Sequence, residues 1–210
     1  TEYKLTPDMA ELIGIIIGDG CIYKNTKNIY QITITGNPIE DKYYMENYLP
    51  KLLNKCLRIK KTPIMAKNKG YIIMFSNKSF VLFLKKLDIT ERKSKTIKIP
   101  NIIMNNKRLL RKCIKGIADT DFTLIFTRNY KYPRITASFA SSNLVKDLEL
   151  ALRNMGFTLN SIYNYKQKDR KRNKILITNR INLDGPHNLK KWLDLIGFSN
   201  FRITSRYELW

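Results

Sequence analysis

Two related helical motifs, the first with glycines on one face and the second with one matching glycine, and each with an aspartate at its end, constrain this chain more than any other feature of its sequence. The first reads LIGIIIGDG, and the second, in the other half of the chain, reads IKGIADTDF. When the two are aligned, Gly116 takes the place of Gly14, and Asp121 takes the place of Asp19. A helix that is apolar on almost all sides is buried. The repeat therefore predicts a duplicated architecture with one acid at the end of each buried helix.

The two aspartates stand where a helix tolerates negative charge poorly. A carboxylate at a helix C-terminus faces the negative end of the macrodipole, at a cost of roughly 0.3–1 kcal/mol. If the glycines let the helices touch, Asp19 and Asp121 emerge side by side and repel each other unless a cation joins them. Mg²⁺ accepts one or two carboxylates together with phosphate oxygens, and such a site supports phosphodiester hydrolysis. The alternative is that both acids are turn-forming residues after a helix.

The charge balance favours a polyanionic partner. Lys and Arg number 39 against 17 Asp and Glu, which gives a formal net charge of +22. Such an excess fits nucleic acid or an anionic membrane face. The apolar runs are much shorter than the ~20 residues that span a bilayer, and the charge is spread along the chain rather than gathered on one peripheral membrane helix. We therefore expect nucleic acid, and no membrane, as the partner.

The cysteine and histidine content excludes several classes of site. The three cysteines, Cys21, Cys56 and Cys113, are far apart and odd in number, which favours reduced packing positions over a disulfide framework. One histidine cannot build a zinc finger or a histidine-based nuclease centre. The sequence therefore predicts an intracellular, reducing compartment, either cytoplasm or organelle matrix.

The order of predicted elements is helix, two strands, helix, two strands, helix, and it occurs twice. This plan predicts an α+β fold with two pseudo-symmetric halves, each an antiparallel sheet with helices on one face. We expect an N-terminal half at residues 1–90, a linker at residues 91–106 and a C-terminal half at residues 107–210. The predicted helices span residues 12–20, 40–57, 78–87, 107–120, 143–155 and 186–196. The predicted strands span residues 21–23, 29–35, 58–66, 71–76, 122–128, 133–140, 158–165 and 174–178, and residues 198–210 are predicted to form a tail.

Polar residues that alternate along the predicted strands indicate a surface for duplex DNA. Gln31, Thr33 and Thr35 alternate with isoleucines, the period-2 pattern of a sheet with one polar face. We expect the outward faces of both sheets to be polar and basic and to form a saddle over ~15 base pairs, because a two-stranded ribbon fits the major groove. The predicted DNA-binding residues are Gln31, Thr33, Thr35, Arg58, Lys60, Arg128, Arg134, Thr136, Ser138, Asn160, Lys166, Lys168, Arg170, Arg172, Thr178 and Arg180. The alternatives are an ordinary solvated strand face and, for the loop charges, a solubilising role.

With these features the chain resembles the LAGLIDADG homing endonucleases, in the single-chain form that carries two copies of the motif. The resemblance spans nearly the whole chain. It implies that the motif helices form the interface between two halves, that the sheets lie in the major groove, and that both DNA strands are cut across the minor groove. The second acid of each motif, here Asp19 and Asp121, would bind metal with help from a neighbouring carbonyl, here that of Gly18 and of Thr120. The expected protein is a monomeric, Mg²⁺-dependent, intron- or intein-encoded endonuclease for double-stranded DNA.

Several positions depart from the pattern of that family. Phe122 stands where the second motif usually has glycine, and Thr120 stands opposite Gly18, so the two helix ends are expected to differ. The region after the second strand of each half holds no lysine to polarise the phosphate. Lys69 or Lys115 would have to supply that charge.

Two other functions remain open on the sequence. The same scaffold serves RNA maturases, which help an intron fold, so intron RNA is an alternative partner. A DNA-binding protein with a decayed active site would keep the basic sheets without cutting. The missing lysines favour this last hypothesis, whereas the retention of both acids opposes it.

Overall fold

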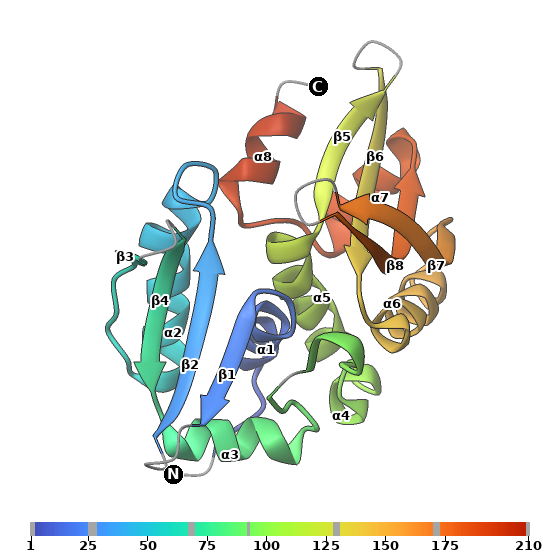
Figure 1. Cartoon of the computed structure of the whole chain (residues 1–210). Helices are drawn as coiled ribbons and strands as arrows, with labels where there is room; N and C mark the ends of the chain where they lie inside the picture. The colour runs from blue at the N-terminus through green and yellow to red at the C-terminus, as the bar shows by residue number, and fades with distance from the viewer. Residues whose placement is uncertain are drawn as a thin grey trace.

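In the computed structural model of the chain, two four-stranded antiparallel sheets stand side by side with the two motif helices between them (Figure 1). The structure describes residues 3–24, 29–66, 70–91, 93–127, 131–169 and 173–208. The strand order is β1-β2-β4-β3 in the first sheet and β5-β6-β8-β7 in the second, so the second sheet repeats the topology of the first. The predicted α+β fold with two similar halves is confirmed.

The first half begins with the motif helix α1 at Pro7–Gly18. Its sheet consists of β1 at Gly20–Lys24, β2 at Tyr30–Gly36, β3 at Ile64–Met65 and β4 at Tyr71–Ser76. The helical elements of this half are a π-helical turn at Tyr44–Tyr48, α2 at Leu49–Leu57 and α3 at Lys78–Lys86.

The second half repeats this order from the motif helix α5 at Lys107–Asp121. Its sheet consists of β5 at Thr123–Thr127, β6 at Tyr132–Phe139, β7 at Asn160–Asp169 and β8 at Lys174–Asp184. Its helices are α6 at Ser142–Asn154, α7 at Pro186–Leu195 and α8 at Phe201–Glu208. Between α3 and α5 lie a 3₁₀ turn at Lys93–Lys95 and a short helix α4 at Asn101–Met104. The division into halves at residues 90 and 107 stays a prediction.

Local signals determine where the helices begin. Pro7 occupies the first turn of α1, and the side chain of Thr6 accepts a backbone hydrogen bond there, as an N-cap residue does. Asn77, Asn106 and Ser141 accept backbone N–H groups in the same way at α3, α5 and α6. Each motif helix therefore starts at a position that the sequence specifies.

The two faces of each sheet differ as the alternation predicts. Ile32 and Ile34 in β2 are buried, as are Ile135 and Ala137 in β6, whereas their polar neighbours are partly or fully exposed. The buried faces belong to one continuous apolar core shared with the helices. The polar faces look outward, toward the viewer in Figure 1, where α2 lies behind the N-terminal sheet.

The predicted strand at residues 58–66 is wrong for most of its length. α2 is capped by Arg58, which adopts a left-handed backbone conformation with φ 56°. Pairing with β4 begins only at Ile64, because Pro63 has no N–H group to donate to a ladder. Arg58 and Lys60 therefore belong to the loop between α2 and β3 rather than to a sheet face.

The predicted helix at residues 40–57 is interrupted by the π-helical turn, which directly precedes α2. Pro50 lies in the first turn of α2, where its missing N–H group and its ring prevent a regular hydrogen-bond ladder from the preceding turn. The proline therefore changes the helix type rather than ending the helix.

The C-terminal region holds more regular structure than predicted. β8 continues to Asp184 rather than ending at residue 178, and the predicted tail contains α8. α8 packs against β5 and buries Ile203, so tertiary burial stabilises a helix that the sequence pattern does not indicate. Of the described helices, none is both long and apolar enough to cross a membrane.

Candidate metal centre and nucleic-acid interface

Glycines let the two motif helices touch backbone to backbone. A Cβ atom on Gly14 would lie 2.1 Å from the carbonyl oxygen of Cys113. A Cβ atom on Gly116 would lie 2.1 Å from the carbonyl oxygen of Glu11. No side chain larger than hydrogen fits at either position without moving a backbone. The predicted close contact at the seam between α1 and α5 is therefore confirmed, and it is equivalent in the two halves.

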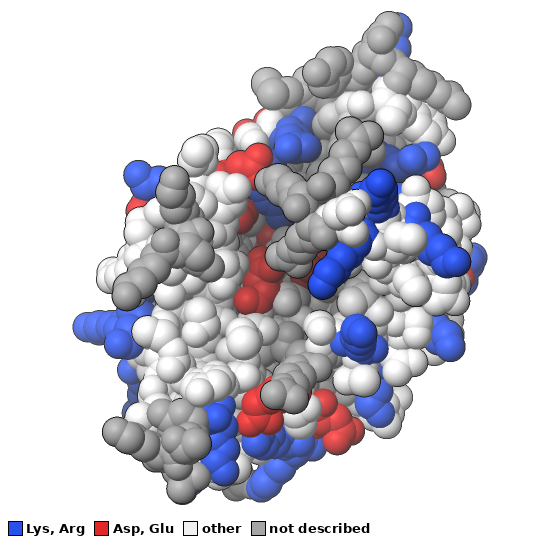
Figure 2. All heavy atoms as spheres, in the orientation of Figure 1, with Lys and Arg blue, Asp and Glu red and all other residues white. Residues whose placement is uncertain are grey.

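This close approach brings the two motif aspartates to one place. Asp19 is the C-cap of α1, directly after Gly18, and Asp121 is the last residue of α5. A Cβ atom on Gly18 would lie 2.1 Å from Oδ2 of Asp121, so the second carboxylate rests on the residue that precedes the first. The hydroxyl oxygen of Thr120 lies 2.8 Å from the same Oδ2 atom. Figure 2 shows acidic side chains in the hollow between the two halves.

The donor set at the seam suits a hard divalent cation. Within the described ranges, no group of three or more His, Cys, Asp or Glu side chains could hold a metal ion by itself. Mg²⁺ commonly uses one or two protein carboxylates and takes further oxygens from water and phosphate. Two aspartates at adjoining helix ends therefore fit a cation that binds together with its substrate. The carbonyl oxygen of Thr120 already accepts a hydrogen bond from Arg202 at 3.3 Å, which leaves one lone pair for a metal.

A buried ion-pair network joins the two motif helices. Glu11 of α1 is fully buried and accepts hydrogen bonds from Lys115 at 2.7 Å and from Lys112 at 2.9 Å. Tyr48 donates to the same carboxylate. Burial by itself would raise the pKa of Glu11, but Lys115 and the hydrogen bonds from Tyr48 and Lys112 together outweigh burial and lower it. Lys115 also lies 3.4 Å from Asp119, so it is held inside the protein and does not supply charge to a phosphate. Lys69, the other lysine considered for that role, lies outside the described residues.

Asp119 ties the C-terminal segment to α5. Its Oδ1 atom accepts the backbone N–H groups of Ser199 and Asn200, at 2.7 Å and 3.1 Å. Burial raises the pKa of Asp119 to about 6, although Lys115 and the two backbone amides oppose this shift. Asp119 therefore belongs to the framework of the seam, and its charge is only partly compensated there.

Arg202 of α8 connects the end of α5 to the other half. Its Nε atom lies 3.1 Å from Oδ1 of Asp41, which follows β2. The same guanidinium donates to the carbonyl oxygens of Thr120 and Phe122, and Asn200 also donates to Asp41, at 2.7 Å. A cation at a helix C-terminus satisfies carbonyl groups that have no partner within the helix. Because the sequence predicts a tail here, it gives no sign of this role.

The outward face of the N-terminal sheet is uncharged. Its residues form three rows across the strands, namely Tyr23, Gln31 and Ser76, then Cys21, Thr33 and Met74, then Thr35, Ile72 and Ile64. None of these is Lys, Arg, Asp or Glu, and Figure 2 shows this half largely white. Gln31, Thr33 and Thr35 lie on the outward face as predicted. The expectation that both faces are basic is wrong for this half, because none of the residues in these rows is basic; Lys24 stands at the end of β1, paired with Tyr30 and outside the rows.

The outward face of the C-terminal sheet carries charge. Its rows are Ile125, Arg134 and Asp184, then Thr123, Thr136, Asn182 and Asn160, then Ser138, Arg180 and Ile162. Arg134 pairs with Asp184 at 2.5 Å, and the guanidinium of Arg180 lies 3.7 Å from the ring centroid of Tyr165. A hollow of about 490 Å³ covers much of this face and reaches Asp121. The acid therefore opens directly onto the charged sheet.

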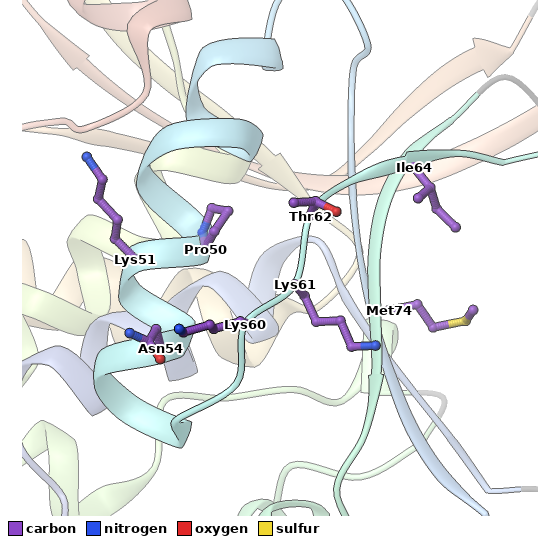
Figure 3. Close-up of a pocket in the computed structure, with 8 residues that line it drawn as sticks. All are labelled: Pro50, Lys51, Asn54, Lys60, Lys61, Thr62, Ile64 and Met74. Carbon is purple, nitrogen blue, oxygen red and sulfur yellow. The ribbon is translucent and has the colours of Figure 1, made fainter.

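A second hollow, of about 700 Å³, lies at the outer edge of the N-terminal half (Figure 3). Lys51, Lys60 and Lys61 line it, together with Ile64 and Met74. In Figure 3, Lys61 extends toward Met74, and Lys60 reaches toward α2. Lysines at the rim of an uncharged face are of the residue type that contacts phosphate groups.

The remaining predicted DNA contacts lie on the long hairpin of β7 and β8 or outside the described residues. Lys166 and Lys168 are exposed on β7. The hydroxyl oxygen of Thr178 is buried and has no hydrogen-bond partner within the described part of the chain, so this hydroxyl group is not presented to a duplex. Arg128, Arg170 and Arg172 lie outside the described residues.

The sequence has two curated relatives that extend well beyond it. A replication factor C small subunit of Methanocaldococcus jannaschii is 30% identical over 202 residues, which are 96% of this chain and 10% of that protein. An uncharacterised protein of the same organism is 24% identical over 142 residues, which are 65% of this chain and 50% of that protein. The chain thus spans half of one relative and a tenth of the other. No protein-family model matches it.

Solved structures match the whole fold. The homing endonuclease I-DmoI, in complex with DNA and Mn, has a TM-score of 0.63 at 18% identity, covering 92% of this chain and 98% of that one. The homing endonuclease I-WcaI, bound to its DNA recognition sequence, has a TM-score of 0.62 at 15% identity, covering 100% of this chain and 88% of that one. The resemblance indicated by the two motifs is confirmed for the fold: the chain has the fold of the single-chain, two-domain LAGLIDADG homing endonucleases.

Proposed function

We propose that this chain is a homing endonuclease that cuts both strands of a long DNA duplex with divalent metal ions. The observation that carries the proposal is the contact between the two helix ends, where the carboxylate of Asp121 rests on Gly18, the residue directly before Asp19. Asp121 adjoins a sheet face that presents Arg134 and Arg180. The neighbouring I-DmoI structures contain DNA with Mn, Mg or Ca, which supports a divalent ion for this chain as well.

In the proposed reaction the motif aspartates hold the metal against the phosphate. Asp19 and Asp121 would ligate it, with the carbonyl groups of Gly18 and Thr120 beside them. A divalent cation held in this way activates a water molecule and neutralises charge on the phosphate. Thr120 orients Asp121 through its hydroxyl group, and the backbone contact between the helices keeps the two carboxylates together. Each acid would serve one strand of the duplex.

The two sheets would hold the duplex on either side of the acids. Gln31, Thr33 and Thr35 face one half-site, and the outward rows of the C-terminal sheet face the other. Phosphate contacts fall to the rim lysines, including Lys60, and to Lys166 and Lys168 on the long hairpin. Cleavage then falls between the half-sites, where the helix ends meet.

The test is cleavage of a plasmid library with randomised inserts, with capture and sequencing of the cut ends. The wild-type protein should cut a recurring sequence in Mg²⁺ and leave it intact in EDTA. Asp19→Asn and Asp121→Asn should each lower the cleavage rate by at least about a hundredfold, because a metal ligand is lost, while binding of the recovered target persists.

The matched control is Asp88→Asn. Asp88 is exposed and has φ 61°, a conformation that asparagine adopts readily, so this variant should cut at the wild-type rate. Cleavage at the wild-type rate by the Asp19→Asn/Asp121→Asn double variant would refute the assignment.

A DNA-binding protein without nuclease activity is the second candidate. The observation that favours it is Lys115, whose ammonium group is bound to Glu11 and Asp119 instead of serving a phosphate. Under this hypothesis the wild-type protein enriches a specific duplex but leaves it uncut in both Mg²⁺ and Mn²⁺. Mg²⁺ as the preferred ion, a monomeric state, binding of intron RNA and an intron-encoded origin stay predictions.

A further inference from the structure

The two sheet faces offer different chemistry to a major groove. The outward rows of the N-terminal sheet hold amide, hydroxyl and apolar groups without charge, whereas those of the C-terminal sheet hold Arg134, Arg180 and Asp184. In the major groove, an arginine pairs with the two acceptors of guanine, and apolar side chains contact the methyl group of thymine. Glutamine pairs with the edge of adenine. The faces therefore match different bases.

On the C-terminal face, neighbouring side chains hold the arginines in place. The guanidinium of Arg180 stacks on Tyr165, and its Nη2 atom donates to Gln167 at 2.8 Å. Gln167 uses one of the five N–H donors that a guanidinium carries. Arg134 is fixed by its ion pair with Asp184. An arginine whose plane is fixed before binding loses less side-chain entropy when it pairs with guanine.

On the N-terminal face, Met74 is the central apolar contact. It lies on β4 directly opposite Thr33, and 40% of its surface is exposed. The amide nitrogen of Gln31 contacts its sulfur atom. The thioether of Met74, which can contact a thymine methyl group, thus lies beside the amide of Gln31, which can pair with adenine. This arrangement suits a thymine–adenine pair.

We propose that the DNA target is chemically asymmetric, with guanine read by Arg134 and Arg180 on the C-terminal sheet and thymine–adenine pairs read by Met74 and Gln31 on the N-terminal sheet. This proposal rests on the proposed binding of duplex DNA by the two sheets, but not on cleavage. The half-site over the N-terminal sheet is then recognised through methyl contacts, with the phosphate charge met by lysines at its rim.

The experiment is selection from a randomised duplex pool with four variants beside the wild-type protein. Arg180→Ala should lose a guanine preference of roughly 5- to 100-fold at one or two positions of one half-site. Met74→Ala should lose a thymine preference in the other half-site only. Arg153→Ala on α6 and Leu82→Ala on α3 are the matched controls, because Arg153 is an exposed arginine and Leu82 has an exposed fraction of 42%, close to that of Met74. Both controls should keep the wild-type motif.

Base analogues then test the atoms involved. Deoxyuridine at the positions that depend on Met74 removes only the methyl group and should weaken wild-type binding about fourfold per site, with no effect on binding by Met74→Ala. 7-Deazaguanine at the positions that depend on Arg180 should weaken wild-type binding roughly 3- to 10-fold, with no effect on Arg180→Ala.

The outcomes separate this inference from the proposed function. The asymmetric reading is overturned if a motif is enriched but its two halves do not change separately in the variants. It is also overturned if the base analogues weaken binding by the alanine variants as much as by the wild-type protein. In both cases DNA binding stands. A pool from which no motif is enriched overturns both. An asymmetric motif that is bound but never cut supports the reading and refutes only the nuclease.

Discussion

The two motif helices arise from one repeat but end differently. α1 ends at Gly18, and Asp19 forms its C-cap with φ −89° and ψ 3°. α5 continues through Asp121, and Phe122 forms its C-cap in an extended conformation with ψ 153°. Phe122 is fully buried and packs against aromatic rings of the core. The second helix thus ends in an anchored aromatic residue, whereas the first is followed by Gly20.

The difference shows how the halves divide the work of placing two acids. The end of α5, in the C-terminal half, is held in place because Arg202 donates hydrogen bonds to the carbonyl groups of Thr120 and Phe122. The end of α1, in the N-terminal half, provides space because only a glycine at position 18 leaves room for the carboxylate of Asp121. The two helices therefore have the same geometry at the seam but different roles at their ends. α5 fixes the position of Asp121, and α1 leaves space for its carboxylate.

The largest expected effect comes from filling the seam. Gly14→Ala and Gly116→Ala each place a Cβ atom 2.1 Å from a carbonyl oxygen of the facing helix, and a backbone cannot rotate away as a side chain does. We expect a loss of about 4–5 kcal/mol in the free energy of unfolding, above the usual cost of overpacking and close to the stability of a small domain. Urea denaturation followed by circular dichroism measures it.

Gly18→Ala is the comparison that separates stability from function. The atoms in its way belong to the side chains of Asp121 and Thr120, which can move, so we expect a loss of only about 1 kcal/mol. The displaced carboxylate should nevertheless lower cleavage at least tenfold, since small misplacements of catalytic groups are costly. Equal destabilisation by all three substitutions would contradict this division between a packed seam and a functional end.

The next largest effect comes from breaking the ion pair between the halves. Lys115→Met leaves Glu11 buried without its main partner and should cost about 3–5 kcal/mol. The double variant Glu11→Leu/Lys115→Met should recover part of that loss, because the buried carboxylate of Glu11 is removed with its partner, whereas the buried Asp119 still loses Lys115. Lys112→Met is the control: its side chain is 40% exposed, so about 1 kcal/mol or less is expected. A double variant less stable than Lys115→Met would show that the pair stabilises the seam outright.

The parts of this molecule that follow from local pattern could be predicted from the sequence. The glycine-and-aspartate repeat indicated the seam, because small residues at one helical face leave few other arrangements. The alternation of Ile32 and Ile34 with polar residues gave the outward face of β2, and Ile135 and Ala137 gave that of β6. Each of these features lies within one turn of helix or one strand, where the chain's own periodicity determines which side is buried.

The parts that depend on distant partners could not be predicted. Arg202 and Asp41 form an ion pair between the two halves, and nothing in the sequence around either residue indicates the other. Glu11 lies in an apolar helix, and nothing in the sequence indicates that it would be buried in an ion pair with Lys115. The strand expected at residues 58–66 failed at Pro63, where the loss of one donor outweighed an otherwise suitable pattern. The charge count predicted a basic protein, but it could not predict that the outward face of one sheet is uncharged.

The buried carboxylate of Asp119 should make the seam respond to pH. Its pKa is raised to about 6 from an ordinary value of 3.8, so the folded state binds more protons than the unfolded state between about pH 4 and pH 6. Stability contributed at this site therefore falls as pH rises through that window, by up to about 3 kcal/mol. The measurement is the unfolding free energy of wild type minus that of Asp119→Asn, at pH 4 and pH 7. A difference that grows with pH would show that Lys115 and the amides outweigh burial.

The smallest of these effects tests whether the brace on α5 matters to the site as well as to the fold. Arg202→Ala removes the ion pair to Asp41 and the donors to two carbonyl groups at the end of α5. We expect a loss of about 2 kcal/mol, since both partners are mostly buried. Arg153→Ala breaks an exposed pair with Glu149 and should cost about 0.5 kcal/mol or less.

If the hydrogen bonds from Arg202 fix Asp121, Arg202→Ala should also lower the cleavage rate under conditions where the variant is fully folded, whereas Arg153→Ala should not. Equal cleavage by the two folded variants would mean that the glycine seam alone positions the acids, and that the two helix ends differ in stability but not in function.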